Sequence, residues 1–387
     1  MSLALALTSL VLSQAYRPTT PVEIYVAPIV APTNILGMGG AAQALATGSG
    51  AMLMNPAAMA VRYDYNGGNW FDWDFSLDYL VSAGDTDIEN SGFDRGDESV
   101  QLLEASLGFN FGRLGVGLSF DSQETRFCGR GFVCDVNSRL RINTVLGALS
   151  ASYAFLDGEV TAGASIIVPS ASFQQGDDQD SPRFSGSAIA LGVVVRPHGQ
   201  PLRLGLSTRL RTDATRDGGG DNAQVGENYI PDALEAPWQI AGGVAWSFGD
   251  KPLNLRNSFG DSRLINEELD QLRRSYITVA ADLVVIGPGG GATGRGAWIA
   301  REEQTAGRAA SLSLRVGAES EFWPNQMRGR IGSYYEPSRF DAADGRIHGT
   351  IGFDFRLLEL IWVWRLSGVF DYARDYRNLG VSIGFWH

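Results

Sequence analysis

The sequence lacks long apolar runs and an excess of positive charge, and each absence excludes a class of protein. Beyond the N-terminus, its 387 residues contain no run of roughly 18 or more apolar residues, which argues against a helical membrane protein. The formal net charge is −12, whereas a protein that binds nucleic acid needs a basic surface. We therefore expect no nucleic-acid partner.

Signs of catalysis and of metal or cofactor binding are also sparse. Of the three histidines, only His348 lies in an alternating pattern that would face an interior, and no serine neighbours it. The glycine-rich stretch 287–296 lacks the lysine and Ser/Thr of a phosphate-binding loop. The acidic runs 85–89 and 177–180 lack the glycine and distal glutamate of a calcium loop. We therefore predict neither an enzyme nor a bound cofactor or metal ion.

The two cysteines and the N-terminus bear on where the chain is located. Residues 1–15 hold a short apolar run that ends in Ser13-Gln14-Ala15, so we expect a signal peptide cleaved after Ala15. The missing positive charge at its start suggests truncation, and an ordinary apolar helix is the alternative. Cys128 and Cys134 lie close together in a polar stretch, which in an exported protein predicts a disulfide that closes a small loop. Two free thiols are the alternative.

What the sequence has in abundance is glycine and strand alternation. The 48 glycines make up about 12% of the chain, against about 7% in most proteins, and favour turns and close backbone approaches. Residues 70–81 read WFDWDFSLDYLV, with apolar side chains at every second position and mostly acidic or hydroxylic ones between them. Successive side chains of a strand leave opposite faces, so this pattern predicts a two-faced strand.

The same period of two recurs about fourteen times. Tight connections alternate with long ones, which indicates an antiparallel up-and-down meander with a short end and a long end. One long connection, 249–274, falls on the short side. The predicted strands are 70–81, 99–111, 114–126, 140–155, 159–171, 185–196, 202–212, 238–248, 275–286, 309–322, 326–336, 347–357, 361–373 and 379–386.

The number of strands decides which face points inward. About eight strands give a barrel that side chains can fill, whereas fourteen enclose a much wider space that cannot stay dry. The polar face should therefore line the lumen and the apolar face should meet lipid, as in outer-membrane barrels with even strand counts and aromatic girdles. We predict a transmembrane β-barrel of the bacterial outer membrane, in contact with lipid and lipopolysaccharide. Its candidate lumen charges are Asp72, Asp74, Asp78, Glu104, Arg203, Arg209 and Arg211.

The stretch before the first strand has a different composition. Residues 36–60, LGMGGAAQALATGSGAMLMNPAAMA, show no alternation and are rich in Gly, Ala and Met. Alanine favours helix and glycine interrupts it, so short helical turns are expected. Asn55 followed by Pro56 is typical of a helix N-cap with a proline in the first turn. The segment is either a plug inside the barrel or a helical lead-in outside it.

Several phrases resemble the FadL-type outer-membrane transporters. The stretch from Gly37 to Ala41, an alanine-rich helix and then Asn55-Pro56-Ala57 is similar to the N-terminal hatch of that family. Downstream, the stretches at 237–246, 315–319 and 328–338 agree in order with the barrel of that family, so the resemblance covers essentially the mature chain. The family commonly has an acidic residue within the hatch, where this chain has 47–50, Thr-Gly-Ser-Gly.

The resemblance implies a monomeric fourteen-stranded barrel that holds an N-terminal hatch. Members capture hydrophobic compounds, typically long-chain fatty acids, near the outer loops and release them sideways through a kink in the third strand. In this chain the third strand carries Gly115 and Gly117. The implied domains are a signal peptide at 1–15, a proline-rich periplasmic lead-in at 16–34, a hatch at 35–65 and the barrel at 66–387. The candidate hatch or gating residues are Gly37, Gly39, Gly40, Asn55, Pro56 and Ala57.

Two groups of side chains are candidates for ligand contact. Tyr229, Ile230 and Leu234 lie in an expected outer loop and are the best candidates for capture of an apolar ligand, although packing within the loop explains them as well. The lumen arginines are able to pair with a carboxylate head group. The alternative, which we favour, is that they form charge ladders with the lumen carboxylates and brace the wall.

One further segment bears on the choice of function. Residues 262–274, SRLINEELDQLRR, have an amphipathic helical pattern on the expected periplasmic side, where they would cap the barrel or dock a periplasmic protein. The leading functional hypothesis is transport of hydrophobic small molecules. The second is a PorV-like barrel of the same superfamily that acts in protein secretion, and a general porin is the third.

Overall fold

The structure is a computed structural model, which describes most of the chain. The described residues are 21–24, 29, 31–62, 70–82, 86–92, 99–127, 140–175, 182–217, 224–225, 228–249, 253–254, 276–300, 304–341, 343–360 and 362–385. Three expectations lie outside them, namely the signal peptide at 1–15, the pairing of Cys128 with Cys134, and the helix at 262–274. Within the described residues, no helix is both long and apolar enough to cross a membrane.

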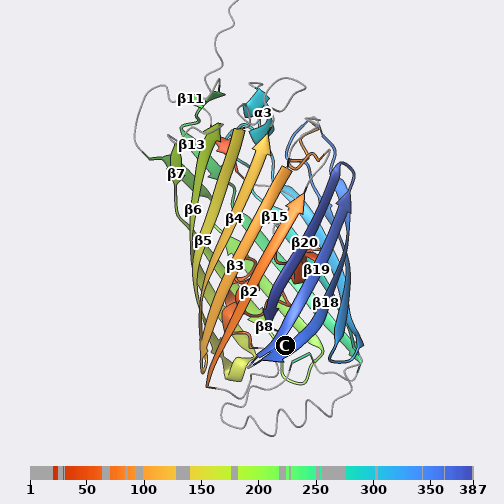
Figure 1. Ribbon diagram of the computed structural model, residues 1–387. Helices are drawn as coiled ribbons and strands as arrows, with labels where there is room; N and C mark the ends of the chain where they lie inside the picture. Colours follow the sequence, from red (N-terminus) through yellow and green to blue (C-terminus); the bar gives the residue numbers. More distant parts are fainter. Residues whose placement is uncertain are drawn as a thin grey trace, which may run out of the picture.

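The predicted barrel is confirmed. Fourteen long antiparallel strands form one sheet, which closes where the first strand, β2, pairs with both β3 and the last strand, β20 (Figure 1). The strands are β2 (Phe71–Ser82), β3 (Ser99–Phe111), β4 (Leu114–Phe127), β5 (Leu140–Phe155), β6 (Val160–Gln175), β8 (Ala188–Val195), β9 (Leu202–Arg209), β14 (Gln239–Gly249), β15 (Tyr276–Ile286), β16 (Ser311–Trp323), β17 (Met327–Glu336), β18 (Arg346–Leu360), β19 (Trp362–Ala373) and β20 (Tyr376–Phe385).

The two faces of the sheet are distributed as the alternation predicts. On β18 the outward Ile351 is 61% exposed, while the inward Thr350 next to it is 1% exposed. Asp72, Asp74 and Asp78 of β2 are all buried on the inner face. A belt of exposed apolar side chains around a polar lumen is the arrangement of a barrel that spans a bilayer, because lipid offers no hydrogen bonds.

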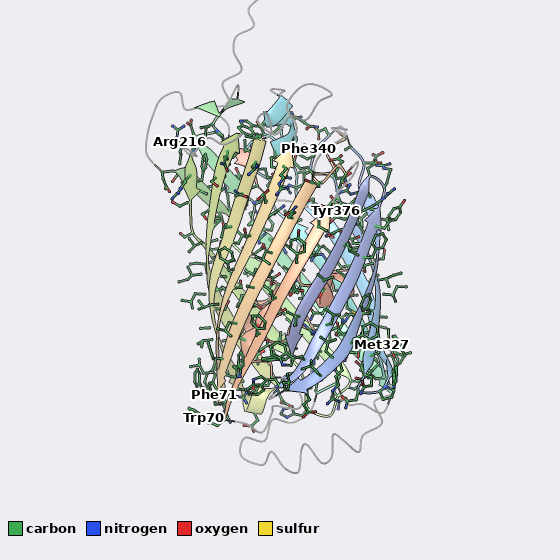
Figure 2. The ribbon with its side chains drawn as sticks, viewed as in Figure 1. Trp70, Phe71, Arg216, Met327, Phe340 and Tyr376 are labelled. Carbon is green, nitrogen blue, oxygen red and sulfur yellow. The ribbon has the colours of Figure 1, made fainter. Side chains whose placement is uncertain are left out.

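Aromatic side chains gather at the end of the barrel with short turns. There Trp73 packs edge-on against Trp362 and Phe385, with ring centroids 5.5 and 4.8 Å apart. Trp70 and Phe71 lie at this end, and Arg216 and Phe340 lie at the opposite one (Figure 2). Aromatic rings with one apolar and one wet side favour the boundary between lipid and water, so this cluster indicates one edge of the membrane.

Three neighbouring barrel strands are interrupted at one level. The short strand β7 (Arg183–Ser185) precedes β8, β10 (Thr212–Arg216) follows β9, and β13 (Ala233–Ala236) precedes β14. The buried residues are odd-numbered in β9 (Arg203 and Ser207) and even-numbered in β10 (Thr212 and Ala214). One extra residue between β9 and β10 therefore acts as a β-bulge and exchanges the inward and outward faces of the strand. The inward and outward faces also exchange between β13 and β14, at the same level. The pairing of β13 with β10 and of β14 with β9 therefore keeps one register.

Beyond this level, toward the long loops, the inner face of the strands becomes apolar and the outer face becomes polar. In β6, Thr161 and Ser165 face inward below the interruption, but Ala171 and Phe173 face inward above it. The outward side changes from Ile166, which is 55% exposed, to hydroxyl and amide residues. A sheet with an apolar inner face and a polar outer face is built for water on the outside, so the strands extend past the bilayer at the end with long loops.

The third strand shows no kink. β4 pairs with β3 and with β5 without any register shift along its whole length. Gly115 and Gly117 face the lumen instead, where an added Cβ would clash with Met59. The glycines that the family resemblance associates with a bend therefore make room for the N-terminal segment.

Residues 31–62, which we call the inner segment, lie inside the barrel. They form α1 (Thr33–Leu36) and two short 3₁₀ helices, η1 (Ser49–Ala51) and η2 (Pro56–Ala60) (Figure 1). As predicted, Asn55 caps η2: its side chain accepts a hydrogen bond of 3.1 Å from the N–H of Ala57, and Pro56 occupies the first turn.

The inner segment approaches the wall at glycines. An added Cβ at Gly205 of β9 would meet the carbonyl of Gln43, and one at Gly163 of β6 would meet the carbonyl of Pro56. At such positions the backbone of the inner segment occupies the space of a side chain. Glycine on the inner wall is therefore a requirement of packing.

The lead-in before the inner segment lies at the end of the barrel with long loops. β1 (Val22–Glu23) runs parallel to β13 and bridges to Thr293 in the connection between β15 and β16. The sequence predicts that residues 16–34 lie on the periplasmic side, which is the end with short turns. Val22 and Glu23 lie at the opposite end instead. The neighbouring strand β15 ends at Ile286, opposite Gln239 of β14, and does not continue alongside β13. The edge of β13 is therefore left for β1 to pair with.

We predict that Gly205→Ala will lower the stability of the barrel, whereas Gly349→Ala will not. A methyl group at Gly205 overpacks against Gln43 and is expected to cost about 1–3 kcal/mol. Gly349 of β18 has open space around the same position. The measurement is the unfolding temperature in detergent by circular dichroism, and equal temperatures for the two variants would contradict the packing.

Candidate ligand-binding site

Aspartates of the wall hold the backbone of the inner segment. Asp282 of β15 accepts hydrogen bonds of 2.7 and 2.9 Å from the N–H groups of Ala42 and Gln43. On β2, Asp74 accepts from the N–H and hydroxyl of Ser49, at 2.6 and 2.9 Å. Each carboxylate thus satisfies backbone groups that have no partner in a helix or sheet, which a buried segment requires.

A third aspartate and a threonine complete these anchors. Asp78 accepts from the N–H and hydroxyl of Thr33, at 2.8 and 3.0 Å. The hydroxyl of Thr350 on β18 donates to the carbonyl of Gly37 and accepts from the N–H of Gly39, both at 3.1 Å. The candidate hatch glycines thus contact the wall, and the inner segment is tied to both sides of the lumen.

The contacts described for the lumen arginines are with groups other than these carboxylates. Arg203 donates to the side chain of Asn254 at 2.7 Å and to the carbonyl of Leu253 at 2.5 Å. Arg211 is partly exposed beyond the interruption and pairs with Asp213 and Glu235, at 3.0 Å each. The charge ladders stay a prediction. Strand alternation gives no information about the inner segment, which supplies donors for Asp74 and Asp78.

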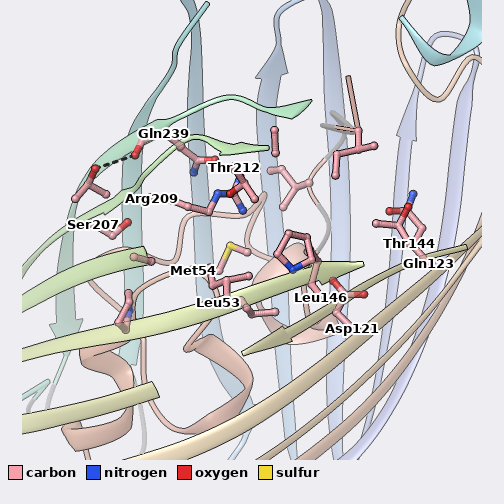
Figure 3. A pocket seen from close by; sticks show the side chains of 18 of the residues that line it. Leu53, Met54, Asp121, Gln123, Thr144, Leu146, Ser207, Arg209, Thr212 and Gln239 are labelled. Carbon is pink, nitrogen blue, oxygen red and sulfur yellow. Dashed lines mark hydrogen bonds between the residues drawn. The ribbon is translucent and has the colours of Figure 1, made fainter. Parts of the chain in front are cut away.

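A cavity lies between the inner segment and one side of the wall (Figure 3). Its volume is about 140 Å³. Inner-segment residues and the lead-in residues Ile24 and Ile29 contribute to the lining, and the wall comes from β4, β5, β6, β8, β9, β14 and β16 together with the edges of the interruption. Its lining residues are Ile24, Ile29, Leu53, Met54, Pro56, Asp121, Gln123, Thr144, Leu146, Ile167, Pro169, Ala190, Ser207, Thr208, Arg209, Thr212, Ala236, Gln239 and Arg315.

The cavity has an apolar middle and polar ends. Leu53, Leu146 and Ile167 pack in one hydrophobic cluster at its centre. Asp121 and Gln123 of β4 lie at one end, and Arg209 of β9 lies toward the other (Figure 3). A concave site with an apolar body and few polar groups is the usual form of a small-molecule binding site.

An apolar roof closes the cavity toward the long loops. Several of its members lie on the strands that line the cavity, at the next inward-facing position toward the long loops. Ala171 is the next inward residue after Pro169 on β6, and Leu234 is the next after Ala236 on β13. Trp298 of α3 (Arg295–Ala300) fills its centre, is 2% exposed and packs 5.1 Å from the ring of Phe173. The whole roof consists of Val22, Leu140, Ile142, Ala171, Phe173, Phe184, Ala214, Ile230, Leu234 and Trp298.

Two of the three candidate capture residues, Ile230 and Leu234, belong to this roof. Ile230 and Leu234 are 6% and 0% exposed, so they face the interior and are not an outer surface. Tyr229 forms a short ladder with Gln224 in strands β11 (Gln224–Val225) and β12 (Asn228–Tyr229), and its side chain lies outside the description. Burial of Ile230 and Leu234 agrees with packing within the loop, the alternative that the sequence left open, because an apolar loop residue gives no sign of which side it packs on.

Buried carboxylates fasten the roof to the barrel. Glu89 accepts hydrogen bonds from the N–H groups of Arg295 and Gly296, at 3.1 and 2.7 Å, and pairs with the Arg295 guanidinium at 3.2 Å. Burial raises the pKa of Glu89 above its ordinary value, against the opposing effect of Arg295. Glu23 of β1 pairs with Arg339 in the same region. Trp298 is thus held in place by loops that are distant in sequence.

His348 faces the lumen, as predicted, in a closed polar group. Its Nδ1 lies 2.9 Å from Asp371 and its Nε2 lies 2.6 Å from Glu336, while Tyr334 stacks on the ring with centroids 4.1 Å apart. His348 is 0% exposed. Because both ring nitrogens already contact carboxylates, neither is available to take a proton from a substrate.

Comparison with known proteins identifies the fold. No family model matches the sequence, and no curated protein sequence is similar to it. Among solved structures, a FadL homologue from Pseudomonas aeruginosa aligns with a TM-score of 0.58 at 13% identity, over 94% of this chain and 99% of that chain. The chain has the FadL-type fold. At this identity the FadL-type likeness establishes the fold alone.

Two further FadL-type structures align over most of their length. The monoaromatic hydrocarbon channel CymD aligns with a TM-score of 0.56 at 13% identity, over 92% of this chain and 98% of that one. The toluene transporter TodX of Pseudomonas putida aligns with a TM-score of 0.55 at 13% identity, over 95% and 99%. The barrel of about fourteen strands predicted from alternation and the FadL-type fold implied by the sequence resemblance thus both agree with independent structures.

Two residues of the site, Asp121 and Asp282, are not among the candidates predicted from the sequence. Each is the single carboxylate on a strand face whose other residues are mostly apolar or hydroxylic. Their spacing along the chain gives no sign that they face the same lumen. The sequence does contain a signal for them. A carboxylate on the inner face of a barrel strand needs a hydrogen-bond donor, and the inner segment is the nearest source of donors.

We predict that Asp282→Ala will loosen the inner segment around residues 42 and 43. Two hydrogen bonds to a charged acceptor are lost, each worth about 1.5–3 kcal/mol, so these amides should exchange at least tenfold faster. The measurement is hydrogen exchange by mass spectrometry in nanodiscs. The control is Ser313→Ala, which removes a buried hydroxyl that donates to Tyr335 and does not touch the segment. Unchanged exchange in Asp282→Ala would contradict the anchor.

Proposed function

We propose that this protein carries hydrophobic small molecules across the bacterial outer membrane and binds them in the cavity above the inner segment. The observation that carries the proposal is the position of the cavity. It is enclosed by the inner segment on one side and by the apolar roof on the other, inside a barrel with a lipid-facing exterior. An apolar solute gains free energy there that it would not gain in an open aqueous lumen.

The inner segment has the contacts that a hatch needs. Its backbone is held by carboxylates and fits against glycines, so its path depends on a few polar contacts and on the absence of side chains. We propose that it is the hatch of this barrel and that it blocks the aqueous route for ions. Movement of the hatch would then require the release of Asp74, Asp78 or Asp282.

The size of the cavity bears on the ligand. A cavity of about 150 Å³ is enough to hold benzene, and the cavity here is of the same order. Two structural neighbours are a toluene transporter and a monoaromatic hydrocarbon channel. We therefore propose a ligand of the size of one aromatic ring or a short acyl chain. A long-chain fatty acid remains within the proposal if its chain extends from the cavity along the apolar roof.

The interruption of the wall offers a sideways route. The cavity is lined by Thr212 and Ala236, which lie at the edges of interrupted strands, and by Pro169 of the continuous strand β6, which accepts a hydrogen bond from Gly186 between β7 and β8. Pro169 has no N–H to donate, and Gly186 approaches the backbone of Asp213 and Ala214 at this point. We propose that ligand leaves the barrel here, toward the bilayer, rather than through the continuously paired β4.

Binding and uptake of a labelled hydrocarbon test this proposal. The purified protein in detergent is expected to bind toluene saturably, and its expression in a bacterial outer membrane is expected to raise toluene uptake. Ala190→Trp should abolish both effects, because Ala190 lines the cavity and an indole fills it. The matched control is Ala164→Trp, which places the same ring on the exposed outer face of the neighbouring strand β6.

Two results would contradict the proposal. One is a folded wild-type protein that binds neither toluene nor a fatty acid. The other is a stoichiometric protein partner that co-purifies with the barrel while uptake does not depend on it, since that result would favour a role in secretion.

A further inference from the structure

The cavity contains a buried carboxylate oxygen that no described group satisfies. Asp121 is 4% exposed and lines the cavity, and its Oδ1 has no hydrogen-bond partner among the described residues. Two residues further along the same face of β4, the amide nitrogen Nε2 of Gln123 is also buried and unpartnered. Buried polar atoms are nearly always paired in native structures, so we expect a partner for these two from outside the described residues.

Asp121 also ends a row of three carboxylates. Asp78 lies directly opposite Glu104 in the pairing of β2 with β3, and Glu104 lies directly opposite Asp121 in the pairing of β3 with β4. All three face the lumen and are at most 4% exposed. Directly opposed residues have Cβ atoms roughly 5 Å apart, so this row repels further negative charge.

No cation within the described part of the chain balances this row. The ion pairs recorded between described residues do not include Asp78, Glu104 or Asp121, and Asp78 is occupied by Thr33 and Ser76. No group of His, Cys, Asp and Glu in the described ranges is arranged to share a metal ion. No cation and no hydrogen-bond donor among the described residues therefore satisfies the Oδ1 of Asp121 at this end of the cavity.

The arginines of the cavity lie elsewhere and contact other groups, although the Nε of Arg315 has no hydrogen-bond partner among the described residues. Arg315 of β16 is directly opposite Asp282 in the pairing of β15 with β16, and its Nη1 donates to Gly40 at 3.4 Å. Arg209 donates to Gln239 at 3.4 Å. Asp121 and Arg209 come from different sides of the cavity (Figure 3). The two arginines therefore do not satisfy Asp121.

We propose that the ligand of this cavity is an apolar molecule with a hydroxyl or amino group, which donates a hydrogen bond to Asp121. The inference rests on the function proposed above and narrows its ligand class. Leu53, Leu146 and Ile167 contact the apolar body, and Gln123 is placed to donate to a ligand oxygen. A pure hydrocarbon leaves Asp121 unsatisfied, and a carboxylate meets the repulsion of the row. A donor group is selected because it removes the cost of a buried, unpaired acceptor.

Four probes with the same seven carbon atoms test this selection. Toluene, benzyl alcohol, benzylamine and benzoate differ only in the group attached to the ring, and their affinities for the purified full-length barrel are compared by calorimetry. We expect benzyl alcohol or benzylamine to bind at least tenfold more tightly than toluene, and benzoate to bind most weakly. Tightest binding of benzoate, or equal binding of toluene and both donor-bearing probes, would overturn the inference.

Variants then assign the effect to Asp121. Asp121→Leu should lower the affinity for the donor-bearing probe at least tenfold while toluene binds as well as before, which also shows that the variant is folded. Asp121→Asn keeps an acceptor without the charge, so it should retain benzyl alcohol and lose benzylamine. The matched control is Ser119→Val, which removes another unpartnered oxygen from the same face of β4 but does not line the cavity.

The outcomes separate this inference from the proposed function. If toluene binds and Asp121→Leu weakens all probes equally, the inference is wrong and the proposed function stands. If none of the four probes binds to the folded wild-type barrel, the proposed function fails and the inference fails with it.

Discussion

Backbone N–H groups of the inner segment donate to aspartate carboxylates on the barrel wall, and the contents of the lumen depend on these hydrogen bonds. A barrel of fourteen strands encloses more space than its own side chains fill. A second layer of chain fills part of that space only if its buried backbone groups find partners. Asp74, Asp78 and Asp282 provide such partners at three points of the wall, and Thr350 provides another. The cavity is the volume that the inner segment leaves open beside another part of the wall, which includes β4, β5, β6, β8 and β9.

The same strands serve two environments along their length. Within the bilayer they place polar residues inward and apolar residues outward. Beyond the interruption they do the reverse, so the roof is a small hydrophobic core with water outside it. The reversal in β9–β10 and β13–β14 needs only one bulge in each, because the side chains of a strand alternate with a period of two. The cavity lies at the level where the pattern changes, between a polar lumen and an apolar roof.

Much of the barrel can be predicted from the sequence, because a membrane strand carries its two environments in its own alternation. Residues 99–111 are strand β3 as predicted, and residues 70–81 differ from β2 by one residue at each end. The interruption was missed because the loss of one step of alternation at Leu210 and Arg211 resembles ordinary variation. The partners of Asp74 and Asp78 were missed because they come from a segment without periodicity. The pairing of Val22–Glu23 with β13 depends on where β15 ends, which the local sequence does not indicate.

Conductance across a planar bilayer tests most directly whether the aspartates hold the inner segment across the lumen. The account predicts that the purified barrel shows no steady ion current, because the segment and the roof fill the lumen. It also predicts that the combined variant Asp74→Ala, Asp78→Ala and Asp282→Ala, once inserted and folded, opens to a lasting current. A wild-type barrel that conducts as freely as an open porin would contradict the account, and so would a folded triple variant as silent as the wild type.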